Sequence, residues 1–66
     1  MFRIVRTSNF NLDFYDEEFV ENIPLFNTEE EARAVAELFN HAVPLRHPDY
    51  WVAKPSNYVL HKGKIP

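Results

Sequence analysis

The chain has 66 residues, ten aromatic side chains, no cysteine and a formal net charge of −3. A chain of this length forms at most one domain, which we take as residues 1–66, and it buries only about 60% of its unfolded surface. The lack of cysteine excludes disulfides and thiolate metal sites as sources of stability. We therefore predict that aromatic packing and self-association as a homodimer supplement a small core.

The sequence lacks signals for a membrane. No apolar run approaches the length of a membrane-spanning helix. Residues 1–6 are too short and too charged to form a signal peptide. We therefore expect a cytoplasmic protein.

The first part of the chain predicts two extended segments around an irregular one. Residues 2–6 predict a short strand, with Phe2 and Ile4 on one face. Residues 10–18 mix large apolar and acidic side chains without a clear period, so we expect a loop there. Residues 19–26 predict a second strand. Pro24 either confines this strand to a sheet edge or ends its pairing, because proline has no N–H to donate.

Residues 28–42 predict an amphipathic helix. Thr28 and Glu31 form the pattern of a capping box, in which the two side chains satisfy free amides of the first turn. Pro44 ends the helix because the residue before a proline is pushed out of the helical region. The apolar side chains recur at helical spacing and form one stripe: Ala32, Val35, Ala36, Phe39, Ala42 and Val43.

The last part of the chain predicts a hairpin. Residues 50–54 and 58–62 are rich in aromatic and β-branched side chains, and the turn residues 55–57 separate them. The element order is then strand, strand, helix, strand, strand. This order predicts an α+β fold, a small antiparallel sheet with one helix packed on one face.

The most unusual feature is an acidic stretch. Residues 13–31 contain eight acids and no lysine or arginine. Helix capping explains Glu29–Glu31, whereas the earlier acids interleave with aromatic side chains that exceed the needs of a small core. The stretch is then either a solvated surface or an acidic and aromatic surface that binds a basic patch on another protein. We assign seven residues to that surface: Phe10, Phe14, Tyr15, Asp16, Glu17, Glu18 and Glu21.

Two other kinds of partner fit the second half of the chain. Arg46, Tyr50 and Trp51 combine a cation with aromatic rings, which suits a small ligand such as a nucleotide. The same mixture on the predicted hairpin suits single-stranded nucleic acid. The negative net charge makes nucleic acid the less favoured partner.

Signals for catalysis are missing. The chain has no cysteine nucleophile, no glycine-rich phosphate loop and no nucleophile elbow. His41, His47 and His61 lack the spacing of a metal site. We therefore expect no enzymatic activity, no metal and no cofactor.

The pattern over residues 19–66 resembles small, mostly uncharacterised proteins of tailed bacteriophages. The residues that carry the resemblance are Phe19-Val20-Glu21-Asn22, Glu30-Glu31-Ala32, Ala36-Glu37, Asn40, Tyr50-Trp51-Val52, Pro55, Tyr58, Leu60 and Pro66. The resemblance implies a protein that binds and inhibits or redirects a host protein, or that counters a host defence system. It implies no particular site residues.

Overall fold

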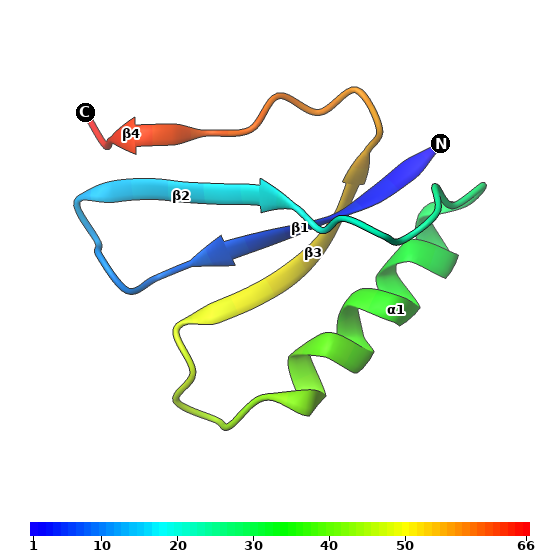
Figure 1. The fold of residues 1–66 in the computed structure, drawn as a ribbon, viewed down its shortest axis with the longest axis horizontal. Helices are drawn as coiled ribbons and strands as arrows, with labels where there is room; N and C mark the ends of the chain where they lie inside the picture. The colour runs from blue at the N-terminus through cyan, green and yellow to red at the C-terminus, as the bar shows by residue number, and fades with distance from the viewer.

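A computed structural model describes all of residues 1–66. Four strands form one antiparallel sheet in the order β3-β1-β2-β4, and one helix packs on it (Figure 1). The element order and the α+β class are those predicted. The elements are β1 (Phe2–Ser8), β2 (Phe14–Phe19), α1 (Glu29–Ala42), β3 (Asp49–Pro55) and β4 (Lys62–Lys64).

The pairing register divides the side chains of the sheet between two faces, because successive residues of a strand point to opposite sides. In the central strand β1, Ile4 pairs with Ala53 and shares its face, which we call the helix face. Val5 pairs with Val52 on one side and Phe19 on the other. These three residues share the opposite side of the sheet, which we call the far face.

Helix α1 begins and ends where the sequence predicts. Thr28 is the N-cap, and its hydroxyl accepts the N–H of Glu31 at 3.2 Å. The same hydroxyl donates to the Glu31 carboxylate at 3.2 Å, so the two capping residues are joined. The helix ends at Ala42, and Val43 before Pro44 is extended.

The helix covers only half of its face of the sheet. It packs on β3 and β1, whereas β2 and β4 extend beyond it (Figure 1). Ala32 and Ala36 are buried in this contact, and the Phe39 ring stacks on Trp51 with 5.7 Å between centroids. Small alanines let the helix approach closely, and the paired rings fill the remaining space.

The segment of residues 56–61, which we call the crossing segment, covers the far face. It leads from β3 at one edge of the sheet to β4 at the other. The Tyr58 ring lies 5.0 Å from Nζ of Lys54 on β3, and its hydroxyl reaches Glu17 on β2 at 2.8 Å. The ring therefore spans the central strand between them. This cover explains why Val5 is 0% exposed although the helix lies on the other side.

Three predicted segments are wrong in detail. Residues 10–18 are a loop only as far as residue 13, because Phe14–Phe19 form β2. The acids in this strand hide its period, since much of it is exposed on both faces. Residues 19–26 form no second strand. Asn22 turns the chain with φ 65°, and only Phe26 forms a bridge, to Phe2.

The predicted C-terminal hairpin is also wrong. β3 pairs with β1, and residues 62–64, rather than 58–62, form β4, which pairs with β2. Residues 58–62 do not pair with β3, because both edges of β3 are occupied. β1 lies along one edge, and the Asn40 side chain of the helix accepts the Trp51 N–H at the other. Residues 55–57 therefore begin a crossing over the sheet.

Candidate functional site

The seven predicted partner-binding residues do not form one surface. Strand β2 alternates them, so that Phe14, Asp16 and Glu18 lie on the helix face. Tyr15 and Glu17 lie on the far face. The other two lie off the strand: Phe10 is in the connection between β1 and β2, and Glu21 is in the turn after β2.

The connection between β1 and β2, residues 9–13, carries the most exposed aromatic residue of the chain. We call these residues the tip. Phe10 is 86% exposed and Leu12 is 78% exposed. Next to the tip, Phe14 is also exposed on the uncovered part of the helix face. Three large apolar side chains in and beside the tip are therefore exposed.

Side-chain hydrogen bonds hold the tip in its conformation. Ser8 Oγ accepts the N–H of Phe10 at 3.2 Å, and Asn11 Oδ1 accepts the N–H of Asp13 at 3.0 Å. Such bonds to the backbone two residues ahead are typical of turns begun by serine and asparagine. The exposed apolar side chains therefore project from a structured turn.

A cluster of charges lies on the helix face beyond the helix. The Arg6 guanidinium lies 3.1 Å from Asp16, 3.4 Å from Glu18 and 3.4 Å from Asp49. Burial lowers the pKa of Arg6, but the hydrogen bond to Asp16 and the three negative charges raise it above its ordinary value. One cation among three carboxylates leaves this cluster net negative. The cluster lies on the same face as Phe14, where Lys62 and Lys64 of β4 stand opposite Asp16 and Phe14.

Glu17 has a different role from its neighbours in β2. Its side chain is only 12% exposed, and its Oε1 accepts the Tyr58 hydroxyl at 2.8 Å and the His61 N–H at 2.7 Å. Nδ1 of His61 also lies 3.0 Å from Oε1. Burial raises the pKa of Glu17, but the hydrogen bonds from His61 and Tyr58 outweigh it and hold that pKa below its ordinary value.

The same cluster changes the acidity of Tyr58. Burial, the hydrogen bond to Glu17 and the nearby charges raise its pKa to about 12. The cluster fastens the crossing segment to β2. Glu17 also lines a cavity of about 190 Å³ beside the tip, together with Leu12 and Phe14. Glu17 therefore holds the crossing segment to β2, and its side chain is much less exposed than the other residues predicted to bind a partner on this strand.

The net charge lies on the helix. Helix α1 contains four glutamates and one arginine, which give −3. The rest of the chain has six acids and six lysines or arginines, and these balance. The acidic stretch therefore divides into a solvated, acidic helix start and a strand whose acids are largely paired.

The structure separates the three residues of the predicted small-ligand site. Tyr50 points to the far face, whereas Trp51 points to the helix face, between Phe39 and His47. Arg46 is exposed in the connection before β3. A hollow of about 370 Å³ near the end of the helix includes Tyr50 in its wall but neither Arg46 nor Trp51.

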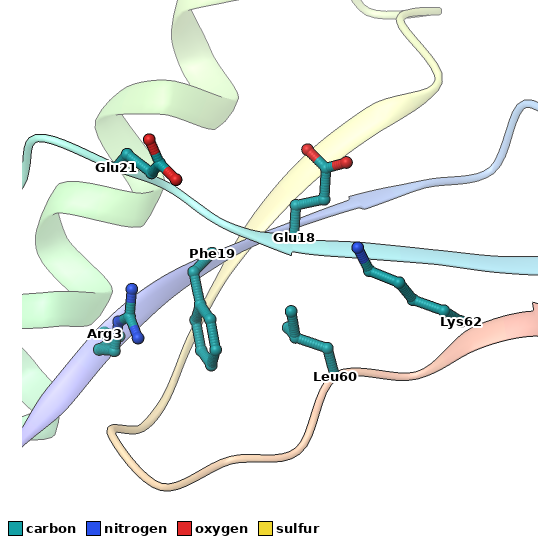
Figure 2. Close-up of a pocket in the computed structure, with 6 residues that line it drawn as sticks. All are labelled: Arg3, Glu18, Phe19, Glu21, Leu60 and Lys62. Atoms are coloured by element: carbon teal, nitrogen blue, oxygen red, sulfur yellow. The ribbon is translucent and has the colours of Figure 1, made fainter.

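A larger groove of about 670 Å³ lies between β2 and the end of the crossing segment. Figure 2 shows Phe19 and Leu60 projecting into it. Four charged residues complete its lining: Arg3, Glu18, Glu21 and Lys62. This groove was not predicted, because the sequence does not show that β4 leaves the edge of β2.

The chemistry around these surfaces offers no metal site. No group of three or more histidine, aspartate and glutamate side chains could hold a metal ion. No helix is long and apolar enough to cross a membrane.

Comparison with known proteins adds nothing further, because no protein-family model, no curated protein and no solved structure matches the chain.

Proposed function

We propose that this chain is a non-enzymatic interaction protein that binds another macromolecule through the tip. The observation that carries the proposal is the exposure of Phe10 and Leu12 from a turn that hydrogen bonds hold in place. Large apolar side chains on a structured loop are typical anchors of an interface, because they lose little conformational freedom on binding.

The chemistry around the tip supports a partner with a basic border. Asp13 lies in the tip, and the net negative cluster of Arg6, Asp16, Glu18 and Asp49 lies on the same face as Phe14. A partner that fits this surface has an apolar pocket with lysine or arginine side chains on the side that meets Asp13 and this cluster, because Lys62 and Lys64 border Phe14 on the side of β4. The resemblance to bacteriophage proteins supports a host protein as that partner, met in the host cytoplasm.

The proposal is tested by affinity capture from a bacterial lysate, followed by reconstitution with the purified partner. The test variant carries Phe10→Ser and Leu12→Ser. The matched control carries Leu45→Ser and Val59→Ser, which replace two apolar side chains elsewhere that are exposed to a similar or greater degree. We expect the test variant to lose at least about tenfold in affinity and the control to retain it.

Salt provides a second readout. If the acidic border contributes, raising the ionic strength weakens the complex of the unmodified chain, because exposed charges are screened. The proposal is wrong if the captured protein binds the tip variant as tightly as the unmodified chain. It is also wrong if the control variant loses the same affinity.

A further inference from the structure

The cavity of about 190 Å³ beside the tip lies at one end of the sheet. The tip forms part of its wall through Asn9, Asn11 and Leu12, and Ile65 near the C-terminus forms another part. Figure 1 shows that the C-terminus and the connection between β1 and β2 lie at the same end of the sheet. No residue of the crossing segment lines the cavity, so the crossing segment does not close it.

The pairing register explains why the far face is hollow at this end. Tyr50 pairs with Thr7, and Thr7 pairs with Glu17, so these side chains form one row across β3, β1 and β2. Two strand spacings separate Tyr50 from Glu17, which is roughly 10 Å. The short side chain of Thr7 lies between them and cannot fill this space. All three residues line the cavity.

Two tyrosine side chains of the far face line this cavity and stay accessible. Tyr15 is 40% exposed and Tyr50 is 39% exposed. The Tyr15 ring contacts the His61 ring, with 5.3 Å between centroids, so the crossing segment supports it from one side. Burial and the bond to Glu17 raise the pKa of Tyr58, and the Tyr50 hydroxyl is near enough to add to this effect. Tyr50 therefore lies near the Glu17 carboxylate.

The wall of the cavity carries a negative charge that no cation in the wall balances. Glu17 lines the cavity, whereas no lysine, arginine or histidine does. The two cations of the far face lie elsewhere. Arg3 stacks over the Phe19 ring at 3.7 Å, and Nζ of Lys54 lies 5.0 Å from the Tyr58 ring. A cation that enters the cavity is therefore attracted by Glu17 and meets no like charge in the wall.

The Glu17 carboxylate can accept a further hydrogen bond. Its Oε1 accepts the Tyr58 hydroxyl at 2.8 Å and the His61 N–H at 2.7 Å. Its Oε2 contacts only the same Tyr58 hydroxyl, at 3.0 Å. An ionised carboxylate has about four acceptor sites, so Oε2 retains capacity for a donor. The hydrogen bonds from His61 and Tyr58 outweigh burial and hold the pKa of Glu17 low, so the carboxylate is charged at neutral pH.

A cavity with two aromatic rings and one carboxylate suits a planar cation. The guanidinium of arginine stacks on aromatic rings, donates to carboxylates and is more weakly hydrated than an ammonium group. We infer that the cavity binds the guanidinium of an arginine side chain on the partner, beside the pocket that receives the tip. The inference rests on the proposed function. Leu12 belongs both to the tip and to the wall of the cavity, so one surface of the partner covers both.

The purified chain tests the cavity without the partner. The probe is N-acetyl-arginine amide, titrated into the isotopically labelled chain while nuclear magnetic resonance follows the signals of Thr7, Tyr15 and Tyr50. We expect saturable shifts with a Kd of about 1–10 mM, because a single side chain makes few contacts. N-acetyl-citrulline amide has nearly the same shape without the charge, and it should cause no saturable shift. N-acetyl-lysine amide should bind at least about threefold more weakly.

Variants separate the ring from the carboxylate. Tyr50→Leu removes one ring and should weaken binding of the arginine probe about two- to fivefold, whereas Tyr50→Phe keeps the ring and should retain the affinity. Glu17→Gln keeps the size of the side chain, removes its charge and should weaken binding about fivefold or more. Leu38→Ala, on the exposed side of the helix, is the control and leaves the affinity unchanged. An unchanged Trp51 signal shows that a variant is folded.

The captured partner gives a second measurement. Tyr50→Leu should weaken the complex by the same factor as it weakens binding of the probe, and Tyr50→Phe should not. A partner that needs Phe10 but binds Tyr50→Leu unchanged overturns this inference and leaves the proposed function intact. The same holds if the arginine probe causes no saturable shift, or if the citrulline or lysine probe binds as tightly. A chain that captures no partner overturns both.

Discussion

The two faces of the sheet are covered in different ways. On the helix face, Ile4, Ala32 and Ala36 are buried in apolar contact, and Phe39 stacks on Trp51. On the far face, a segment of six residues without regular structure is fastened to β2 through the carboxylate of Glu17. The cover of the helix face is therefore held mainly by packing, whereas the cover of the far face is fastened by hydrogen bonds to one charge over the buried Val5.

This difference explains how so short a chain covers both sides of a sheet. Apolar burial has no direction, so a helix with a stripe of small and aromatic side chains can cover the helix face by itself. An irregular segment buries less apolar surface and needs directional bonds to hold it in place. Four predictions test this comparison, in order of decreasing effect.

The largest effect is expected on the helix face. Ile4→Ala removes a buried side chain between the sheet and the helix, and we expect it to lower the free energy of unfolding by about 2–5 kcal/mol. Urea unfolding followed by circular dichroism measures the change. Ile4→Val gives a graded comparison, at about 0.5–1.5 kcal/mol. Leu38→Ala, on the exposed side of the helix, should change stability by less than about 0.5 kcal/mol, and an equal loss there would contradict the prediction.

The next effect is expected on the far face. Glu17→Ala removes the acceptor for Tyr58 and His61, and we expect a loss of about 2–3 kcal/mol because charged hydrogen bonds are lost together. Limited proteolysis within residues 56–61 should rise at the same time. Glu18→Ala, on the other face of the same strand, removes a partly exposed ion pair and should cost less than about 1 kcal/mol. Similar losses for both variants would show that the position of the carboxylate is unimportant.

A smaller effect is expected where the helix meets the outer edge of β3. Asn40→Ala removes two hydrogen bonds to Trp51, and we expect a loss of about 1–2 kcal/mol. The freed backbone groups should also make the chain more prone to aggregate, which light scattering measures. His41→Ala, the next residue of the helix, is exposed and should change neither property. Aggregation of both variants to the same degree would contradict the protective role of Asn40.

Local signals predicted part of this structure. Thr28, Glu31 and Pro44 set the ends of the helix through neighbours in the sequence, and the structure confirms both ends. The element order followed from such signals as well. The pairing of the strands did not follow from local signals. Residues that flank a strand in the sequence do not show which other strand will lie beside it in the sheet.

The residues of the candidate surfaces were also only partly predicted, because their contacts join parts of the chain that are far apart in the sequence. Glu17 and Tyr58 are 41 residues apart, so no spacing in the sequence connects them. Phe10 was predicted as a surface residue and is exposed, whereas Glu17 was predicted on the same surface and is held inside the fold. The alternation of β2 separates them, and the mixed acidic and apolar pattern of residues 10–18 concealed that strand.

The smallest effect concerns pH, because protonation leaves the Glu17 carboxyl in place and removes only its charge. The pKa of Glu17 in the folded chain lies below its ordinary value of 4.5. Its contribution is therefore fully present above that value and is lost as the pH falls through the lower pKa of the folded chain. We expect the difference in unfolding free energy between the unmodified chain and Glu17→Gln to shrink below pH 4.5.

At alkaline pH the contribution of Tyr58 to stability is lost as the pH rises, whereas that of Glu17 is lost as the pH falls. The pKa of Tyr58 is raised from 10.0 to about 12, so its contribution is complete below pH 10 and is lost as the pH rises toward 12. Ultraviolet titration of the unmodified chain should show Tyr58 ionising well above its ordinary pKa of 10.0, and Glu17→Gln should bring its pKa back toward that value. The Phe39–Trp51 contact lies on the helix face and involves neither Glu17 nor Tyr58, so the near-ultraviolet signal of Trp51 should persist where the far face has begun to open. If the Trp51 signal changes at the same pH as the opening of the far face, at either end of the pH range, the two faces unfold as one unit and the comparison between them fails.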